Sequence, residues 1–327
     1  MRVVVASLNP AIERLLVVDR NVPGSVHRLA LSETLAGGKG VNVARVLRQL
    51  ATMDAADHRS GDEELESILV GPIGGPTGAL QEALLEREDI AASHCRVDGW
   101  TRTNEVLVDR SEPDRATVYN AAGPELSPSE VEDLRRLAVA SLDDADALVC
   151  TGSLPPGVPV TFYAEWISEA KRRGIPTVLD SSGDALLSGA RAHPTVVKIN
   201  SDELDEVSHA TSVSRGDVVG GWRAGGSDAV IVTDGARATR AVTSAGTFVV
   251  TSPAVATRSA VGSGDAYTAG LVWGLLRRPQ LGWPGHLSLA AACGASNAAS
   301  VFARLSEDHP PQSLIEHVTV RYEENRP

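Results

Sequence analysis

The sequence predicts an α/β fold in which a doubly wound, mostly parallel sheet is flanked by helices. Three observations support this prediction. Short aliphatic runs alternate with helical patterns, the runs lead into Gly, Ser, Asn or Asp, and 327 residues can enclose a large core. We expect residues 1–327 to form a single domain that binds its ligands where the parallel strands end.

The strands of this sheet are predicted from six runs that are continuously aliphatic rather than alternating, as expected for strands buried on both faces. The runs are RVVVASL, SILVG, ALVCTGS, TVLDSS, TVVKIN and AVIVTDG. Helical patterns occur at 40–50, 78–86, 129–141, 160–173, 202–210, 264–276 and 287–303. Because helix and strand alternate, a doubly wound sheet is the natural arrangement.

Two segments break this alternation. Residues of about 12–35 and 96–120 read as short alternating strands with turns, so they predict a small β-sheet that projects over the rim as a lid. The stretch 51–67 is polar and acidic, which predicts a solvated surface insertion. We expect the polar tail after Asp308 to be peripheral.

Composition excludes several classes of protein. The formal net charge of −12 argues against a nucleic-acid partner, because phosphate backbones require basic surfaces. The sequence has neither a signal-peptide pattern nor an apolar run long enough to span a membrane, so we expect no membrane association. Its three cysteines are odd in number and far apart, which predicts reduced thiols in a cytoplasmic protein.

The first motif is the glycine-rich stretch LAGGKGVNVARVL at residues 35–47. It is no Walker A loop, since Glu33 stands at the first glycine position and Gly40 follows Lys39. It is either a turn with a helix cap or a place where a polyhydroxylated ligand approaches the backbone closely. In the second case Asn42 and Lys39 supply the polar contacts.

The second motif is VGSGDAYTAGL, in which Gly262, Ser263 and Gly264 precede an apolar helical pattern. Their N–H groups would form an anion hole at a helix N-terminus, suited to a phosphoryl group in transfer. Asp265 beside them could accept the proton of an attacking hydroxyl. The alternative is that Asp265 merely caps the helix.

Two further motifs follow strands. In VVKINSDELDEV, Lys198, Asn200 and Glu203 have the spacing N-x-x-E, which suits either a carboxylate near Mg²⁺ and phosphate oxygens or a capping box. In VTDGARAT, Thr233 and Gly235 could contact a phosphate. Alone, the last motif carries little weight.

Taken together and in order, these motifs resemble those of the ribokinase-like sugar kinases of the PfkB type. SLNPAIE, AGGKGVNVARVL, CTGSLPPGV, LDSSGDAL, VKINSDEL, VTDGARA and VGSGDAYTAGL carry the resemblance, over roughly residues 1–305. The chain is most similar to the branch that phosphorylates hexose phosphates, which contains 1-phosphofructokinase and tagatose-6-phosphate kinase.

The resemblance implies roles on the nucleotide side. Asp265 would be the catalytic base, and the amides of Gly262, Ser263 and Gly264 the anion hole, with serine replacing the usual alanine. Glu203 would act on Mg²⁺. The residues implied to bind ATP are Lys198, Asn200, Thr233, Gly235 and Asn297, the last beside the adenine.

On the sugar side, the resemblance implies binding by the glycine-rich motif, that is by Gly37, Gly38, Lys39 and Asn42. Arg102 would bind the phosphate of the sugar. Glu13 stands where the family usually has an aspartate that binds sugar hydroxyls, and it is one methylene longer.

The predicted function is therefore an ATP-dependent, Mg²⁺-assisted kinase that transfers the γ-phosphoryl group to a hydroxyl of a sugar phosphate, as 1-phosphofructokinase does with a ketohexose phosphate. The alternatives are a kinase of an unphosphorylated sugar or nucleoside, and a non-catalytic regulator with the same fold. An oxidoreductase is disfavoured because LNPAIE, not G-x-G-x-x-G, follows the first strand. The sequence leaves open whether K⁺ is needed and whether two lids pair in a homodimer.

Overall fold

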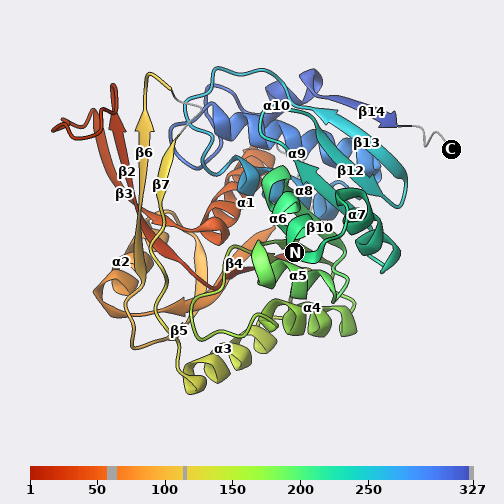
Figure 1. The fold of residues 1–327 in the computed structure, drawn as a ribbon, viewed down its shortest axis with the longest axis horizontal. Coiled ribbons are helices and arrows are strands. Elements are labelled where there is room, and N and C mark those ends of the chain that lie inside the picture. The colour runs from red at the N-terminus through yellow and green to blue at the C-terminus, as the bar shows by residue number, and fades with distance from the viewer. Residues whose placement is uncertain (57–64, 113–115, 324–327) are drawn as a thin grey trace.

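The computed structural model describes residues 1–56, 65–112 and 116–323. Within these residues the chain forms a ten-stranded sheet with helices on both faces, and a separate four-stranded sheet that stands to one side of it (Figure 1). This arrangement confirms the predicted α/β fold and its small second sheet. Among the helices described, none is both long and apolar enough to cross a bilayer.

The large sheet contains every strand predicted from the aliphatic runs, and four more. Its strands are β1 (Arg2–Ser7), β4 (Glu66–Ile73), β5 (Ala91–Arg96), β8 (Ala147–Thr151), β9 (Thr177–Asp180), β10 (Val196–Asn200), β11 (Ala229–Thr233), β12 (Thr239–Thr243), β13 (Gly246–Thr251) and β14 (Thr319–Glu323). Their order is β14-β13-β12-β11-β10-β9-β8-β1-β4-β5. The strands from β5 across to β11 are parallel, whereas β12, β13 and β14 continue the sheet antiparallel.

The helices agree with the predicted patterns, with three additions, two of them eight residues or longer. They are α1 (Lys39–Ala56), α2 (Gly75–Arg87), α3 (Pro128–Ala140), α4 (Phe162–Arg172), α5 (Gly183–Ala190), α6 (Ser201–Thr211), α7 (Arg215–Ala224), α8 (Ser263–Arg277), α9 (Gly282–Ala298) and the short α10 (Pro311–Leu314). Helix α5 has only eight residues, and α7 contains three glycines, which weaken a helical pattern. Both were therefore missed in the sequence.

The prediction that the whole stretch 51–67 is a surface insertion is partly wrong. Helix α1 continues through it to Ala56, and β4 has already begun at Glu66. Its residues 57–64 lie outside the described residues. The tail after Asp308 lies at the periphery, where β14 pairs with β13 as the edge strand.

The central strand β1 shows why the sheet carries helices on both sides. Val3 and Val5 belong to the core shared with α1, α8 and α9, whereas Val4 and Ala6 belong to the core shared with α3, α4 and α5. All four side chains are fully buried. Successive residues of a strand point to opposite faces, so a continuous aliphatic run requires a cover on each face.

The small sheet consists of β2 (Ala11–Val18), β3 (Leu31–Gly37), β6 (Arg102–Asp109) and β7 (Thr117–Tyr119), in the order β3-β2-β6-β7. Its strands come from the two predicted segments, although residues 113–115 of the second lie outside the part described. One face buries Leu15, Val17, Val106 and Val108, which pack against Val261 and neighbouring residues of the large domain. The small sheet therefore rests directly on the loop that leads into α8.

Two strands of the large sheet approach each other closely just before this rim. A Cβ atom on Gly71 of β4 would lie 1.9 Å from the carbonyl oxygen of Ser7 at the end of β1. No side chain can be placed there without moving one of the two backbones. Gly71 thus allows the ends of the parallel strands to come together.

Replacing Gly71 with alanine tests this close approach. We expect Gly71→Ala to lower the free energy of unfolding by roughly 1–3 kcal/mol, because the added carbon must displace backbone, and thermal denaturation would show a lower Tm. The matched control is Gly220→Ala in α7, where nothing lies within 4 Å of the new carbon. Alanine favours a helix over glycine by about 1 kcal/mol, so the Tm of Gly220→Ala should be unchanged or higher. An unchanged Tm for Gly71→Ala would contradict the packing described.

Candidate active site

The carboxyl ends of the parallel strands, the small sheet and the loop before α8 enclose a cleft of about 1140 Å³. Most residues singled out in the sequence meet there. Those that line it are Glu13, Gly38, Lys39, Asn42, Arg102, Lys198, Asn200, Glu203, Thr233, Gly235, Gly262, Ser263, Gly264 and Asp265. Motifs separated by more than 200 residues therefore form one site.

Asp265 lies in the first turn of α8, but it does not cap the helix. The helix follows Gly262, which has a φ of +82° and provides no side-chain cap. The Asp265 carboxylate instead accepts a hydrogen bond from Nδ2 of Asn42, at 2.8 Å from Oδ2. The simple capping alternative is thus excluded, and the side chain is held towards the glycine-rich motif.

The surroundings of Asp265 alter its acidity. Burial, the largest cause, raises the pKa of Asp265 to about 6, and the negative charge of Asp180 adds to this effect. The positive charges of Lys39 and Lys198 and the hydrogen bond from Asn42 oppose it. A carboxylate with this pKa is ionised at pH 7 and is basic enough to take up a proton.

Open amides lie beside this carboxylate. The N–H groups of Gly264 and Asp265 make no hydrogen bond within the described residues, as expected at the start of a helix. The N–H of Ser263 donates to the carbonyl of Ala260 at 3.2 Å, so this amide already has a partner, and its place in the anion hole stays a prediction. A Cβ on Gly264 would lie 3.0 Å from Nζ of Lys198, which brings a positive charge to the same point.

The prediction that Asn297 contacts adenine is also wrong. Its side chain is fully buried and does not line the cleft. Its Nδ2 donates to the Val261 carbonyl at 2.8 Å and to Oγ of Ser263 at 3.2 Å. Asn297 therefore holds the loop before α8 in place. The α9 residues that face the cleft are small, namely Ala291, Gly294, Ala295 and Ala298.

Asp180, at the end of β9, contacts two lysines that line the cleft, and sequence reasoning missed it. It is fully buried and accepts hydrogen bonds from Nζ of Lys198 at 2.9 Å and Oγ1 of Thr268 at 2.8 Å. Burial favours its neutral form, but Lys198 and Lys39 outweigh burial and hold the pKa of Asp180 at about 2. The signal that could have identified Asp180 is a charged residue at the end of a buried aliphatic strand.

Lys39 was predicted to bind the sugar, and in the structure it also forms two ion pairs inside the protein. Its ammonium group lies 3.6 Å from Oδ1 of Asp180 and 3.6 Å from Oε1 of Glu203. The attraction of Asp180 is the main reason that the pKa of Lys39 is raised. Lys39 thus links the carboxylates on the floor of the cleft.

Asn200 and Glu203 form a capping box as well as lining the cleft. Oδ1 of Asn200 accepts from the N–H of Glu203 at 2.8 Å, and Oε2 of Glu203 accepts from the N–H of Asn200 at 2.9 Å. In the described ranges no group of three or more His, Cys, Asp and Glu side chains could hold a metal. A single carboxylate in the cleft still fits Mg²⁺, which is commonly bound by one or two carboxylates together with substrate phosphates.

At the other wall of the cleft, Thr233 ends β11 and its hydroxyl donates to the Ile199 carbonyl at 3.3 Å. Gly235 follows with a φ of +54°, in the left-handed region that favours glycine. The turn at this strand end therefore exposes backbone to the cleft.

Glu13 and Arg102 lie on neighbouring strands of the small sheet, β2 and β6. Burial raises the pKa of Glu13, while the charge of Arg45 opposes that rise. The half-buried guanidinium of Arg102 donates to the carbonyls of Asn9, at 2.8 Å, and Ala121, at 2.9 Å. Gly37 does not line the cleft, contrary to prediction: a Cβ there would lie 2.6 Å from Cβ of Glu13, so Gly37 makes room for that side chain.

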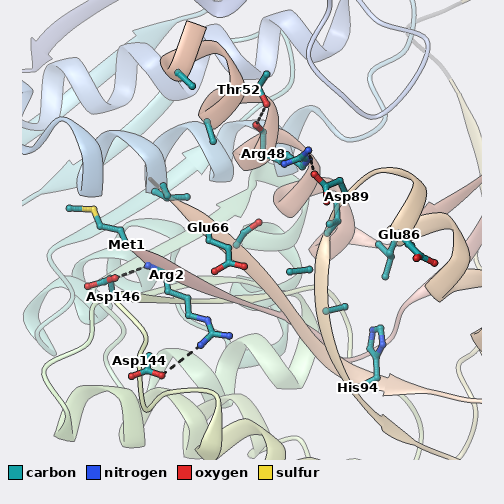
Figure 2. A pocket seen from close by; sticks show the side chains of 18 of the residues that line it. Met1, Arg2, Arg48, Thr52, Glu66, Glu86, Asp89, His94, Asp144 and Asp146 are labelled. Atoms are coloured by element: carbon teal, nitrogen blue, oxygen red, sulfur yellow. Dashed lines mark hydrogen bonds and ion pairs between the residues drawn. The ribbon is translucent and has the colours of Figure 1, made fainter. Parts of the chain in front are cut away.

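A second cavity, of about 1050 Å³, lies near the start of β1 and β4 (Figure 2). Both of the arginines that line it are paired with aspartates that also line it. The Arg2 side chain pairs with Asp144, and the backbone N–H of Arg2 donates to the carboxylate of Asp146. The side chain of Arg48 pairs with Asp89. None of the sequence motifs contributes to this cavity, so the cleft around Asp265 is the candidate active site.

A basic carboxylate beside open helix amides, at the rim of a parallel sheet, is the arrangement expected of a kinase that transfers a phosphoryl group. Residues 2–309 match the family described as pfkB family carbohydrate kinase, so the chain belongs to this family and is a sugar kinase. It is similar to 1-phosphofructokinase of Xanthomonas campestris, with 30% identity over 84% of this chain and 85% of that protein. It is also 28% identical to 1-phosphofructokinase of Escherichia coli, over 92% of each chain.

Among solved structures, it is similar to phosphofructokinase-2 from Escherichia coli in complex with potassium. The TM-score is 0.79 with 25% identity, and the match covers 96% of this chain and 98% of that one. This similarity confirms the predicted kinase fold.

The pKa of Asp265 leads to a prediction for stability. Its folded-state pKa of about 6 is above the ordinary value of 3.8, so ionising it destabilises the folded protein. That penalty is complete above pH 6 and disappears below about pH 4. We expect Asp265→Asn to have a higher Tm than the unchanged protein at pH 8, with a difference that shrinks as the pH falls from 6 to 4. Asp308→Asn, at an exposed position, controls for the change in net charge. A difference in Tm that is constant across this range would contradict the assignment.

Proposed function

We propose that the protein transfers the γ-phosphoryl group of ATP to a hydroxyl of a ketohexose phosphate, as its curated relatives named 1-phosphofructokinase suggest. The observation that carries the proposal is the position of Asp265. Its carboxylate lines the cleft next to the free amides at the start of α8 and is bonded to Asn42 from the glycine-rich motif.

The proposed reaction uses these groups in sequence. The acceptor hydroxyl gives its proton to Asp265 while its oxygen forms a bond to the γ-phosphorus, and the bond from that phosphorus to the bridging oxygen breaks and releases ADP. Asn42 occupies Oδ2 of Asp265, which leaves Oδ1 for the proton. The amides of Gly264 and Asp265 stabilise the charge on the transferred group.

The two ends of the cleft suit the two substrates. The small side chains of α9 leave room for a purine to approach the helix, whereas Glu13 and Arg102 provide an acceptor for sugar hydroxyls and a cation on the small sheet. Arg102 has five N–H donors, of which three are directed at the carbonyls of Asn9 and Ala121. The remaining donors support binding of a phosphate on the acceptor.

Mg²⁺ is expected next to Glu203, together with the phosphates of ATP, where it would neutralise part of their charge. The need for K⁺ stays a prediction, supported by the similarity to a phosphofructokinase-2 in complex with potassium. Pairing of two small sheets in a homodimer, closure of the small sheet as a lid and a cytoplasmic location also stay predictions.

Substitution of the proposed base tests the reaction. We expect Asp265→Asn to lower kcat by ~10²-fold or more with a ketohexose phosphate, because the general base is lost. The Kd of ATP from calorimetry should be nearly unchanged. Asp202→Asn, an exposed carboxylate at the cleft's edge, is the control and should keep its kcat. An Asp265→Asn variant with close to full turnover would exclude the base role, and an unmodified protein without turnover on any acceptor would favour a non-catalytic regulator.

Arg102 separates a sugar phosphate from an unphosphorylated sugar or nucleoside. A hydrogen bond between charged partners contributes about 1.5–3 kcal/mol, so Arg102→Ala should raise KM for the best phosphorylated acceptor by roughly 10- to 100-fold and leave KM for ATP unchanged. Arg14→Ala, at an exposed arginine of β2 that pairs with Glu105, is the control. Steady-state kinetics over a panel of phosphorylated and unphosphorylated acceptors gives the answer. A KM that does not respond would reject phosphate binding by Arg102.

A further inference from the structure

Arg45 is a buried arginine of α1 that does not line the cleft. Its guanidinium donates to four different partners. Nη2 donates to the Ala36 carbonyl at 2.7 Å, and Nη1 donates to the Ala303 carbonyl at 3.3 Å and to Oδ1 of Asn42 at 2.9 Å. Nε and Nη2 form a forked pair with the carboxylate of Glu88. Such a network fixes the guanidinium in one place.

The contact with Asn42 has a consequence for the amide. A guanidinium has only donors, so the atom of Asn42 that faces it must be the oxygen. The NH₂ group must then face Asp265, as the 2.8 Å contact requires. In the opposite orientation the amide oxygen would face the carboxylate, an arrangement that is tolerated only when Asp265 carries a proton.

We propose that Arg45 is a positioning residue for catalysis: held by Glu88, it fixes the amide orientation of Asn42 and so keeps Asp265 ionised, with one oxygen free for the acceptor hydroxyl. This inference rests on the proposed role of Asp265 as the base. It concerns a residue that contacts neither substrate site.

Four side chains act on the acidity of Asp265, and Arg45 is not one of them. Lys39 from α1 and Lys198 from β10 favour the ionised carboxylate, and Asp180 from β9 disfavours it. The hydrogen bond from Asn42 is the one side-chain hydrogen bond to Asp265 in the part of the chain that the structure describes. Because the charge of Arg45 is not among the causes that shift the pKa of Asp265, the proposed effect of the arginine on Asp265 runs through the orientation of the Asn42 amide.

Arg45 also faces Glu13, whose pKa its charge lowers. Glu13 is proposed to bind the acceptor, so an effect through Glu13 should appear in KM. An effect through Asp265 should appear in kcat and in its dependence on pH. The two routes can therefore be separated by kinetics.

The experiment measures kcat at saturating substrates between pH 5 and 9 for Arg45→Met and for Arg48→Met. Arg48 lies one turn further along α1 and also contacts the Glu88 backbone, but its side chain pairs with Asp89 and not with Asn42. In Arg45→Met we expect the acidic limb of the kcat profile to move to higher pH by about one unit. Without Arg45 the Asn42 amide can turn over, and the ionised carboxylate of Asp265 then loses the hydrogen bond from the Asn42 NH₂ group. kcat at pH 6 should then fall several-fold more than kcat at pH 8. Arg48→Met should leave the profile unchanged.

Removing Arg45 alone leaves the partly exposed carboxylate of Glu88 without its partner and leaves the Ala36 carbonyl without its donor, so that variant could lose stability. The double variant Arg45→Met/Glu88→Met removes both charges and should show the same shift of the acidic limb. A folded variant whose acidic limb stays in place, or in which only KM changes, overturns the role of Arg45 while Asp265→Asn still abolishes turnover. Full turnover by Asp265→Asn would instead overturn the base assignment, and this inference with it.

Discussion

The cleft depends on the balance between buried carboxylates and two lysines. Asp180 and Asp265 are both buried at the ends of neighbouring elements, where like charges repel and water cannot screen them. Lys198 bonds Asp180 directly, and Lys39 bridges Asp180 and Glu203. Because a buried charge without a partner is strongly destabilising, the lysines and carboxylates must be present together. The charge network therefore also fixes where the strand ends and α1 meet.

The glycine-rich motif has a second use that follows from the spacing along α1. Asn42 and Arg45 are three residues apart, so they lie on one face of the helix and can touch each other. This face is turned towards the start of α8, more than 200 residues further along the chain. The motif thus lines the cleft through Gly38 and Gly40 and contacts the proposed base through its helix.

The sequence predicted much of this fold because its central strands are aliphatic on both faces, a pattern that only a covered parallel sheet explains. It could not reveal β5 or β12–β14, whose patterns are weaker. The four signature motifs were found because their glycines and polar residues stand at strand ends. Asn297 was misassigned because α9 is apolar around most of its circumference, so the sequence does not indicate which side faces the cleft. Asp180 bonds Lys198 and Thr268, and Arg45 is held by Glu88; these partners are distant in sequence, and only the tertiary structure brings them together.

The small sheet shares an apolar core with Val261, which immediately precedes Gly262 at the start of α8. A rigid displacement of the sheet must therefore either separate these side chains or pull the glycine loop along with it. This contact therefore connects the small sheet, which holds the proposed acceptor residues, to the loop before the proposed anion hole. If the small sheet closes as proposed, an absent acceptor would leave this loop out of place, and ATP would then be less exposed to attack by water.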